Sequence, residues 1–438
     1  MTVEQVNNPE ARIVPRAEHR ISRANISSNA LKVLYRLKNA GYEAYLVGGS
    51  VRDLSLGLEP KDFDVATDAR PEAVRALFRN CRLIGRRFRL AHVHFGPEII
   101  EVATFRALHD PAEESNGDRV IEDGLIVRDN VYGTLAEDAL RRDFTINALY
   151  YNIADFSVVD QVGGINDLNA GLVRLIGDPE VRYREDPVRM LRAIRFAVKL
   201  GLKIHPDTAA PIQPMAELLQ NIPTARLFEE CLKLFLAGVA LESFEALRRL
   251  GVFAELFPGV EEALAKDEHG VGLRFISLAL QSTDSRIAEQ KSVTPVFLFA
   301  ALLWPAVQAA MQHYREHEGL AELPAMQAAA EAVLRQQLQR VGIPKRFSIP
   351  MREVWMMQLR LQRIGGRRSN RLLSRPRFRA AYDFMLLRAE VGEVEPAVAE
   401  WWTDFQSGTE ENRQVMSEEA VPVRRRRRRR RKRQASSE

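Results

Sequence analysis

This sequence has little cysteine and no long apolar runs. Its only cysteines, Cys81 and Cys231, lie far apart and form no Cys-x-x-Cys pair. A disulfide framework and a thiolate zinc site are therefore not expected. No apolar segment approaches the length of a membrane span, and residues 1–20 lack the apolar core of a signal peptide. We expect a cytoplasmic protein without membrane contact.

The 438 residues, of which 46% are hydrophobic and 8% aromatic, are enough for roughly two to four domains. The charge is unevenly placed. Of 63 Lys and Arg residues, ten form one run from Arg424 to Arg433, and the remaining 53 face 58 Asp and Glu residues. Because like charges repel, we expect this run to be a disordered arm that contacts RNA or another polyanion. The alternative is a solvated tail without function.

The order of the patterns predicts an α+β protein, with a mixed sheet and helices first and an all-α part after it. Residues 1–25 are polar, without periodicity, and predicted to be flexible. The predicted elements that follow are a helix over 28–41 with Ser28 as N-cap, a strand over 42–47, a short helix with Ser50 as N-cap, a strand over 62–67, a helix over 68–80 with Pro71 in its first turn, and strands over 81–85, 90–96 and 99–107.

Later segments complete this organisation. Residues 109–129 predict a loop, strand patterns return over 150–162, and the chain beyond Asp178 has helical periodicity. A polar linker from about residue 406 leads to the basic run. The predicted divisions are a flexible N-terminus (1–25), a head (26–170), a helical neck (171–238), a helical body (239–345), a helical C-terminal region (346–405) and a linker with the basic tail (406–438).

Two aspartates interrupt an apolar segment, residues 61–67 (KDFDVAT). Strand side chains alternate between faces, so Asp62 and Asp64 would share one face, where their charges repel. A divalent cation such as Mg²⁺, which takes hard oxygen ligands, would offset this repulsion. Glu101, in another predicted strand, is placed to add a third carboxylate. The alternative is a surface strand with two solvated acids.

A glycine pair lies just upstream, in YLVGGSVRD, between a predicted strand and a predicted helix. At Gly48 and Gly49 the backbone N–H groups can approach a phosphate without a Cβ in the way. Ser50 would add a hydroxyl and Arg52 a guanidinium. The alternative is a tight turn that needs two glycines. If the first interpretation holds, the phosphate cradle and Asp62 would meet at one edge of the strands.

These motifs resemble those of the class II nucleotidyltransferases of the polymerase β superfamily, which include bacterial poly(A) polymerases and tRNA CCA-adding enzymes. The resemblance extends through RRDFTINALYYN, DQVGGINDL and LIGDPEVRYREDPVRMLRAIRFA, and covers about residues 20–235. IPKRF, RFRAAYD and the basic tail resemble bacterial poly(A) polymerases more loosely. The resemblance implies a polymerase β-like head followed by a helical neck and body that bind the nucleotide base and RNA.

The resemblance also implies that Asp62 and Asp64 bind two Mg²⁺ ions. One would lower the pKa of the RNA 3′-hydroxyl, and the other would hold the triphosphate for attack on its α-phosphorus. In RRDFTINAL it implies a catalytic Asp143, with Arg142 near phosphate and Asn147 in support.

The identity of the third carboxylate stays open at this point. The strand pattern favours Glu101, whereas the family motif favours Asp143.

The segment REDPVR is similar to the base-recognition motif of the family. Asp186 would accept a hydrogen bond from an exocyclic amine, and Arg189 would donate one to a ring nitrogen, which favours ATP and CTP over GTP and UTP. The alternative is an ordinary i, i+3 salt bridge at the start of a helix.

Other residues are weaker candidates. His92 and His94 share a strand face, but no further soft ligand accompanies them, which argues against a zinc site. The His109-Asp110 pair has no partner histidines for a metal phosphohydrolase. The segment GRRFRLAH resembles the one that separates poly(A) polymerases from CCA-adding enzymes, and its arginines, expected to contact triphosphate or RNA, are Arg86, Arg87 and Arg89.

Three functions compete. The motifs suit a template-independent poly(A) polymerase that adds AMP from ATP to RNA 3′ ends and releases pyrophosphate, and they equally suit a tRNA CCA-adding enzyme. GRRFRLAH and the basic tail favour the first, because such a tail suits sequence-independent RNA binding. A non-catalytic RNA-binding adaptor would lack a metal-binding carboxylate, and none is missing. We expect a monomer that binds single-stranded RNA 3′ ends.

Overall fold

The computed structural model describes residues 11–85, 89–107, 119–122, 125–129 and 131–419. The chain divides into two compact units, unit 1 with Met1–Pro223 and Glu242–Glu255, and unit 2 with Thr224–Leu241 and Leu256–Glu438. The predicted fold class is confirmed, because a mixed sheet with helices precedes a mostly helical part. The finer predicted divisions, near residues 170, 238, 345 and 405, stay predictions.

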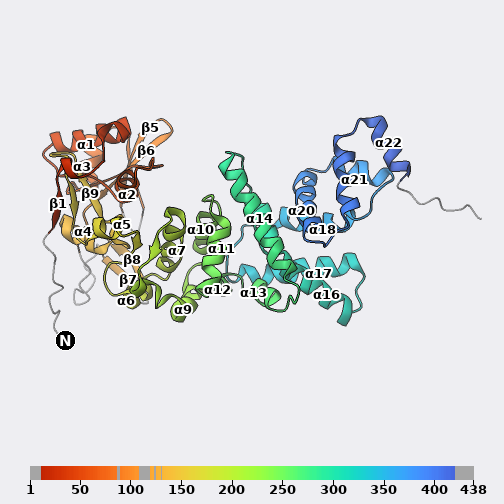
Figure 1. Ribbon diagram of the computed structural model, residues 1–438. Helices are drawn as coiled ribbons and strands as arrows, with labels where there is room; N and C mark the ends of the chain where they lie inside the picture. The colour runs from red at the N-terminus through yellow and green to blue at the C-terminus, as the bar shows by residue number, and fades with distance from the viewer. Residues whose placement is uncertain (1–10, 86–88, 108–118, 123–124, 130, 420–438) are drawn as a thin grey trace, which may run out of the picture. The chain divides into compact units, whose positions relative to one another are not determined.

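The centre of unit 1 is an eight-stranded sheet in the order β1-β10-β9-β2-β3-β6-β5-β4 (Figure 1). All neighbouring strands are antiparallel except β3 and β6, which are parallel. The strands are β1 (Arg12–Val14), β2 (Ala44–Val47), β3 (Asp64–Thr67), β4 (Cys81–Ile84), β5 (Leu90–Phe95), β6 (Glu98–Thr104), β9 (Leu149–Asn152) and β10 (Val158–Asp160).

Helices pack against this sheet, and part of one sheet face is left to charged side chains. Helices α1 (Ser28–Asn39) and α3 (Pro71–Leu77) pack against it, and α1 presents the buried stripe that its period of 3.6 predicts. On the face that carries Val47 and Ala66, Ala139 of α4 (Leu135–Arg141) completes a hydrophobic cluster. The part of this face around β3 and β6 carries charged side chains instead, and there the site is found.

The helical pattern predicted beyond Asp178 is also confirmed. In or shared by unit 1 are η3 (Thr145–Asn147), α5 (Gly164–Asn169), α6 (Pro179–Glu185), α7 (Val188–Leu200), α8 (Pro206–Ala209), α9 (Ile212–Met215), η4 (Ala216–Asn221), α11 (Ala240–Arg249) and α12 (Val252–Leu256). A short parallel pair, β11 (Leu172–Val173) and β12 (Lys203–Ile204), accompanies them.

Unit 2 is helical throughout its described residues. Its helices are α10 (Thr224–Phe235), α13 (Pro258–Ala265), α14 (Val271–Ala288), α15 (Pro295–Leu302), α16 (Trp304–His317), α17 (Glu322–Leu338), α18 (Lys345–Leu361), α19 (Arg367–Leu373), α20 (Phe378–Glu390), α21 (Pro396–Ser407) and α22 (Glu410–Glu419). Three buried tryptophans, Trp304, Trp355 and Trp402, anchor its core, and each indole N–H donates to an oxygen within the unit.

Three segments differ from their prediction. Arg12–Val14, expected to be flexible, forms edge strand β1, where Val14 is buried and pairs with Val158. Within the predicted loop 109–129, Arg119–Glu122 (β7) and Leu125–Asp129 (β8) form an antiparallel hairpin. The predicted polar linker contains α22, which packs against α21. For β1, pairing with the distant strand β10 provides stability that a local pattern does not reveal, whereas the β7–β8 hairpin and the packing of α22 on α21 join segments that are near in sequence.

The starts of two helices also differ from their prediction. The N-cap of α1 is Ser27, whose Oγ accepts from the Asn29 amide, and not Ser28. Helix α2 (Gly49–Leu56) begins after Gly48, so Ser50 lies inside the helix and does not cap it. Pro71 does occupy the first turn of α3, as predicted.

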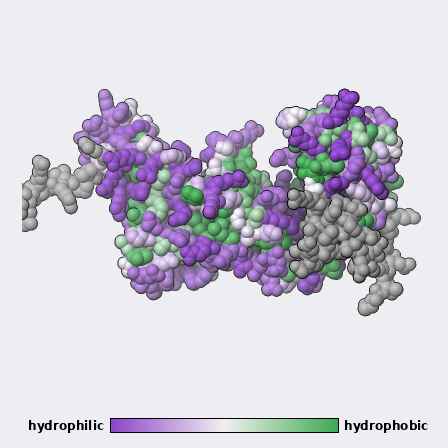
Figure 2. All heavy atoms as spheres, turned by 180° about the vertical axis from the view of Figure 1, so that it is seen from behind, coloured by the Kyte–Doolittle hydropathy of each residue, from purple (hydrophilic) through white to green (hydrophobic). Residues whose placement is uncertain are grey.

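No single helix in the described ranges is long and apolar enough to cross a membrane, and the bent pair α15 and α16 passes only the length and composition test. Both helices of that pair contribute buried residues to the core of unit 2. On the face shown in Figure 2, hydrophilic side chains predominate, with smaller hydrophobic areas among them.

Candidate active site

The parallel pair β3 and β6 places two carboxylates side by side. Asp64 is in register with Glu101, so both side chains point to the same face of the sheet. On its other side Asp64 is in register with Val47, and beyond Glu101 lies His92, whose Nε2 is 3.4 Å from Glu101 Oε1. Asp62 lies exposed just before β3, two residues upstream. The structure thus places Glu101 beside the aspartate pair.

The electrostatics of Asp64 reflect this crowding. Although its side chain reaches solvent, its pKa is raised to about 6, first by burial among protein atoms and then by the negative charge of Glu101. Asp62 adds to the rise, and the positive charge of Arg142 opposes it. A carboxylate whose pKa is raised by neighbouring negative charges is in a favourable environment for a cation. The side chains present therefore fit Mg²⁺, although no three His, Cys, Asp or Glu groups in the described residues form a preassembled cluster.

The glycine pair lies between β2 and α2, as predicted. Gly48 has a φ of 73° and a ψ of −132°, which a residue with a Cβ rarely adopts, and a Cβ there would lie 3.4 Å from Arg142 Nη1. Gly49 opens α2, whose first N–H groups point out of the helix end. Ser50 is buried and its Oγ donates to the Val47 carbonyl at 3.0 Å, so in this state its hydroxyl supports the turn.

A network of polar side chains holds the segment that carries Asp143. Buried Arg52 donates from Nη1 to Asn147 Oδ1 at 2.6 Å, and Asn147 Nδ2 lies 3.4 Å from Asp143 Oδ1. Asp143 Oδ2 forms a 2.6 Å ion pair with Arg192 Nη2 of α7. Asp53 accepts from the far side of Arg52. The predicted Arg52, Asn147 and Asp143 are therefore brought together in one network.

Arg142 carries the positive charge that lowers the pKa of Asp64. Its Nε donates to the Tyr150 hydroxyl at 2.9 Å, and its Nη2 lies 3.2 Å from Asp138 Oδ2. The Tyr150 hydroxyl in turn donates to Asp138 at 2.7 Å. These partners hold the guanidinium beside the glycine turn, where its charge acts on Asp64. The role of Arg142 near phosphate stays a prediction.

The segment DQVGGINDL, residues 160–168, packs against η3 and so supports the segment that carries Asp143. The Asp160 carboxylate accepts from the amides of Val162, Gly163, Gly164 and Ile165 at 2.9–3.1 Å. This loop packs Gly164 so closely on η3 that a Cβ would lie 2.2 Å from the Thr145 carbonyl oxygen. Sequence reasoning noted the motif without a role, and its role here is to position the residues from Asp143 to Asn147.

The predicted base-recognition residues lie at the junction of α6 and α7. Asp186 follows α6, and its Oδ1 accepts from the Val188 amide at 3.2 Å. Arg189 Nη1 pairs with Glu185 Oε2 at 2.8 Å and also donates to the Arg182 carbonyl. The contact of Arg189 with Glu185 is an i, i+4 pair, and Glu185 also forms an i, i+3 pair with Arg182.

The side chain of Arg182 connects helix α6 to the segment that precedes Asp143. Arg182 Nη2 donates to the carbonyl oxygens of Arg141 and Arg142, at 2.9 and 2.6 Å. Sequence reasoning missed both Arg182 and Arg192, because their helical spacing looks the same as that of solvated arginines.

Several predicted residues lie outside the described ranges, namely Arg86, Arg87, His109, Asp110 and Arg424 to Arg433. Arg89 is described and forms an ion pair with Glu72 of α3.

Three family models match this chain. The Poly A polymerase head domain matches residues 44–174 and so contains the acids, the glycine turn and Asp143. The model described as the probable RNA and SrmB-binding site of polymerase A matches residues 201–264, and the polymerase A arginine-rich C-terminus matches residues 318–435.

Known proteins are similar over different lengths. Poly(A) polymerase I of Salmonella typhimurium is 51% identical over 422 residues, 95% of this chain and 90% of that protein. A CCA-adding enzyme of Lactobacillus gasseri is 36% identical over 238 residues, 54% of this chain and 57% of that protein. The solved Bacillus stearothermophilus CCA-adding enzyme in complex with CTP has a TM-score of 0.56 and 25% identity, covering 85% of this chain and 80% of that one.

Proposed function

The chain belongs to the bacterial poly(A) polymerase I family of nucleotidyltransferases, and from this we propose that it adds AMP from ATP to RNA 3′ ends without a template, releasing pyrophosphate. The similarity to poly(A) polymerase I extends over 95% of the chain, whereas that to the CCA-adding enzyme covers 54%. This difference favours poly(A) addition over CCA addition.

The observation that carries the proposed chemistry is the register of Asp64 with Glu101. Two adjacent carboxylates with Asp62 close by supply hard oxygen ligands on one face of the sheet. We propose that Asp62, Asp64 and Glu101 hold two Mg²⁺ ions, with Glu101 as the third carboxylate. When bound, Mg²⁺ ions lower the pKa of an attacking hydroxyl and neutralise the charge that develops on the phosphates.

The residues of the chain itself bind and orient the triphosphate. The turn at Gly48 and Gly49 lets backbone N–H groups approach phosphate oxygens, and the start of α2 carries partial positive charge. Arg142, fixed by Asp138 and Tyr150, faces the same turn and neutralises phosphate charge without further reorganisation.

We further propose that Asp143 positions this machinery and that Asp186 and Arg189 bind the adenine base. Asp143 is held by Arg192 and Asn147, and so keeps its segment in place against α7. Arg189 can donate to a ring nitrogen of the base once its contact with Glu185 is exchanged for the nucleotide. Asp186 presents a carboxylate acceptor to the exocyclic amine.

The test is nucleotide incorporation by the purified protein with Mg²⁺, supplying ATP alone or CTP alone. The acceptors are an unstructured RNA and a tRNA that lacks its last three nucleotides. We expect long extension of the unstructured RNA with ATP alone. Extension of the tRNA by two nucleotides with CTP alone, and by three when CTP and ATP are supplied together, would instead assign CCA addition. RNA binding without any incorporation would assign a non-catalytic adaptor.

A further inference from the structure

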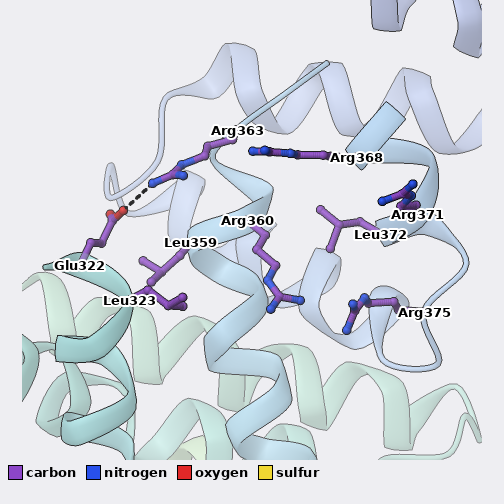
Figure 3. A pocket seen from close by; sticks show the side chains of 9 residues that line it. All are labelled: Glu322, Leu323, Leu359, Arg360, Arg363, Arg368, Arg371, Leu372 and Arg375. Carbon is purple, nitrogen blue, oxygen red and sulfur yellow. Dashed lines mark hydrogen bonds and ion pairs between the residues drawn. The ribbon is translucent and has the colours of Figure 1, made fainter. Parts of the chain in front are cut away.

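A cavity of about 330 Å³ in unit 2 is lined by five arginines (Figure 3). It lies between the start of α17, the end of α18 and the region of α19. Its lining residues are Glu322, Leu323, Leu359, Arg360, Arg363, Arg368, Arg371, Leu372 and Arg375. We call it the arginine pocket. A cavity of this volume is large enough for a small ligand, since typical ligand pockets begin at about 300 Å³.

Among the described residues, most of the positive charge of the arginine pocket has no acidic partner. Arg363 Nη2 forms a 3.0 Å ion pair with Glu322 Oε2, drawn as a dashed line in Figure 3. Toward the residues that the structure describes, no hydrogen bond or ion pair is found for the other four guanidinium groups, those of Arg360, Arg368, Arg371 and Arg375. All four are exposed. Like charges held this close favour binding of an anion.

The shape and chemistry point to a phosphate-bearing chain. Guanidinium groups bind phosphate oxygens through two parallel hydrogen bonds, which lysines cannot do. Leu359 and Leu372, both less than 10% exposed, and the more exposed Leu323 give the pocket an apolar part against which a ribose or base can pack. No aromatic side chain lines the pocket, so it offers no stacking platform for a particular base.

We propose that the arginine pocket binds the sugar–phosphate backbone of single-stranded RNA, with one nucleotide against the leucines and its flanking phosphates on the arginines. This rests on the proposed function only for the presence of an RNA substrate. The pocket is separate in sequence from the basic run Arg424 to Arg433 and from the catalytic acids. It gives the folded body an RNA contact that does not depend on base sequence.

The experiment compares two double variants of the full chain with equal loss of charge. Arg360→Gln with Arg371→Gln removes two pocket arginines, whereas Arg352→Gln with Arg379→Gln removes two exposed arginines of α18 and α20 that do not line the pocket. Binding of a labelled unstructured RNA is measured without ATP or Mg²⁺ over a range of salt concentrations. Thermal unfolding of each variant confirms that the fold is kept.

We expect the pocket variant to bind RNA about tenfold more weakly, with a salt dependence shallower by about 1.4, since each phosphate contact on a single strand contributes about 0.7 to the slope. The control variant should lose less than about twofold. Equal losses in both variants would show a net-charge effect and overturn the proposal, and so would unchanged binding in the pocket variant.

Two further arms separate the alternatives. If polyglutamate binding depends on Arg360 and Arg371 while RNA binding does not, the pocket recognises an acidic protein segment and the proposal fails. Incorporation of AMP is assayed separately. If the wild type adds no AMP, the proposed function is overturned. If the pocket variant nevertheless binds RNA more weakly than the wild type, the proposal for the arginine pocket is still supported.

Discussion

Asp143 and Arg192 form an ion pair of 2.6 Å, between Oδ2 and Nη2, that joins the segment Asp143 to Asn147 to α7. Asp143 Oδ1 accepts from the Phe144 amide at 2.8 Å and is approached by Asn147. Its carboxylate is only 11% exposed and both oxygens have partners. Asp64 and Glu101, by contrast, lie side by side on neighbouring strands, and the charge of Glu101 helps to raise the pKa of Asp64. The structural roles of the two candidate third carboxylates are therefore different, which makes them separable by experiment.

The first prediction concerns the metal-binding acids. Asp62→Ala or Asp64→Ala should reduce AMP incorporation at least about a thousandfold, because several kcal/mol of charge stabilisation are lost, and should leave RNA binding nearly intact. Single-nucleotide incorporation and RNA affinity are measured side by side. Full activity in either variant would rule out the assignment of these residues to the metal site.

The second prediction separates Glu101 from Asp143. Glu101→Gln should raise the Mg²⁺ concentration needed for half-maximal activity, because a ligand is lost. Asp143→Asn should leave that concentration unchanged and instead lower the unfolding free energy by about 1–2 kcal/mol, because Arg192 loses its partner in a half-exposed setting. A shift of the Mg²⁺ requirement in the Asp143 variant alone would reverse the assignment.

The third prediction follows from the raised pKa of Asp64. A carboxyl with a folded-state pKa of about 6 is protonated more readily in the folded than in the unfolded chain, where its pKa is about 3.9. The folded state therefore loses stability as the pH rises from about 4 to 6. Because Asp64 is exposed and solvent screens its charge, we expect a loss on the order of 1 kcal/mol.

The corresponding measurement is thermal unfolding with a metal chelator. Asp64→Asn should unfold at a higher temperature than the wild type at pH 7.5, and the difference should vanish near pH 4. Added Mg²⁺ should stabilise the wild type more than this variant. A variant that is less stable than the wild type at pH 7.5 would contradict the electrostatic account.

The fourth prediction concerns Gly164, in the loop that packs against η3. Gly164→Ala should destabilise the protein by more than about 2 kcal/mol and reduce incorporation, because its Cβ would lie 2.2 Å from the Thr145 carbonyl oxygen, and backbone must move. Gly163→Ala is the matched control. A Cβ at Gly163 meets nothing within 4 Å, so only its φ of 83° opposes the change, at about 1 kcal/mol. Equal effects of the two substitutions would refute the packing argument.

The fifth prediction concerns the basic run, which lies outside the described residues. Removing Arg424 to Arg433 should weaken RNA binding and make its salt dependence shallower, with single-nucleotide chemistry almost unchanged, because fewer counterions are released on binding. The measurement is RNA affinity against salt concentration for both chain lengths. An identical slope would refute a role for the run in RNA binding.

The sequence predicted the parts of the site whose information is local. Strand-like segments between turn signals located β2, β3, β5 and β6, and the glycine pair marked the turn before α2. The family membership was also predicted, since its motifs are specific. Periodicity and capping patterns did not predict elements whose stability depends on a distant segment. Strand β1 is an example, because it forms only where β10 offers it a hydrogen-bonding edge.

The geometry of the site required the structure. Nothing in the sequence states that β3 and β6 pair in parallel, and so the choice between Glu101 and Asp143 was open. Arg192 had no distinguishing signal, because an arginine every few residues is ordinary on a helix. Ser50 was expected to contact phosphate, but its hydroxyl donates within the turn, a detail of backbone geometry that composition does not contain.

The parallel pairing of β3 with β6 has a consequence for how this chain tolerates insertions. The segment between them contains α3, β4 and β5, and its length does not set the alignment of Asp64 with Glu101, which the strand ladder alone determines. Residues added to its turns would leave the acids together. A single residue added inside β6 before Glu101 would turn that carboxylate to the opposite side of the sheet, among buried apolar side chains.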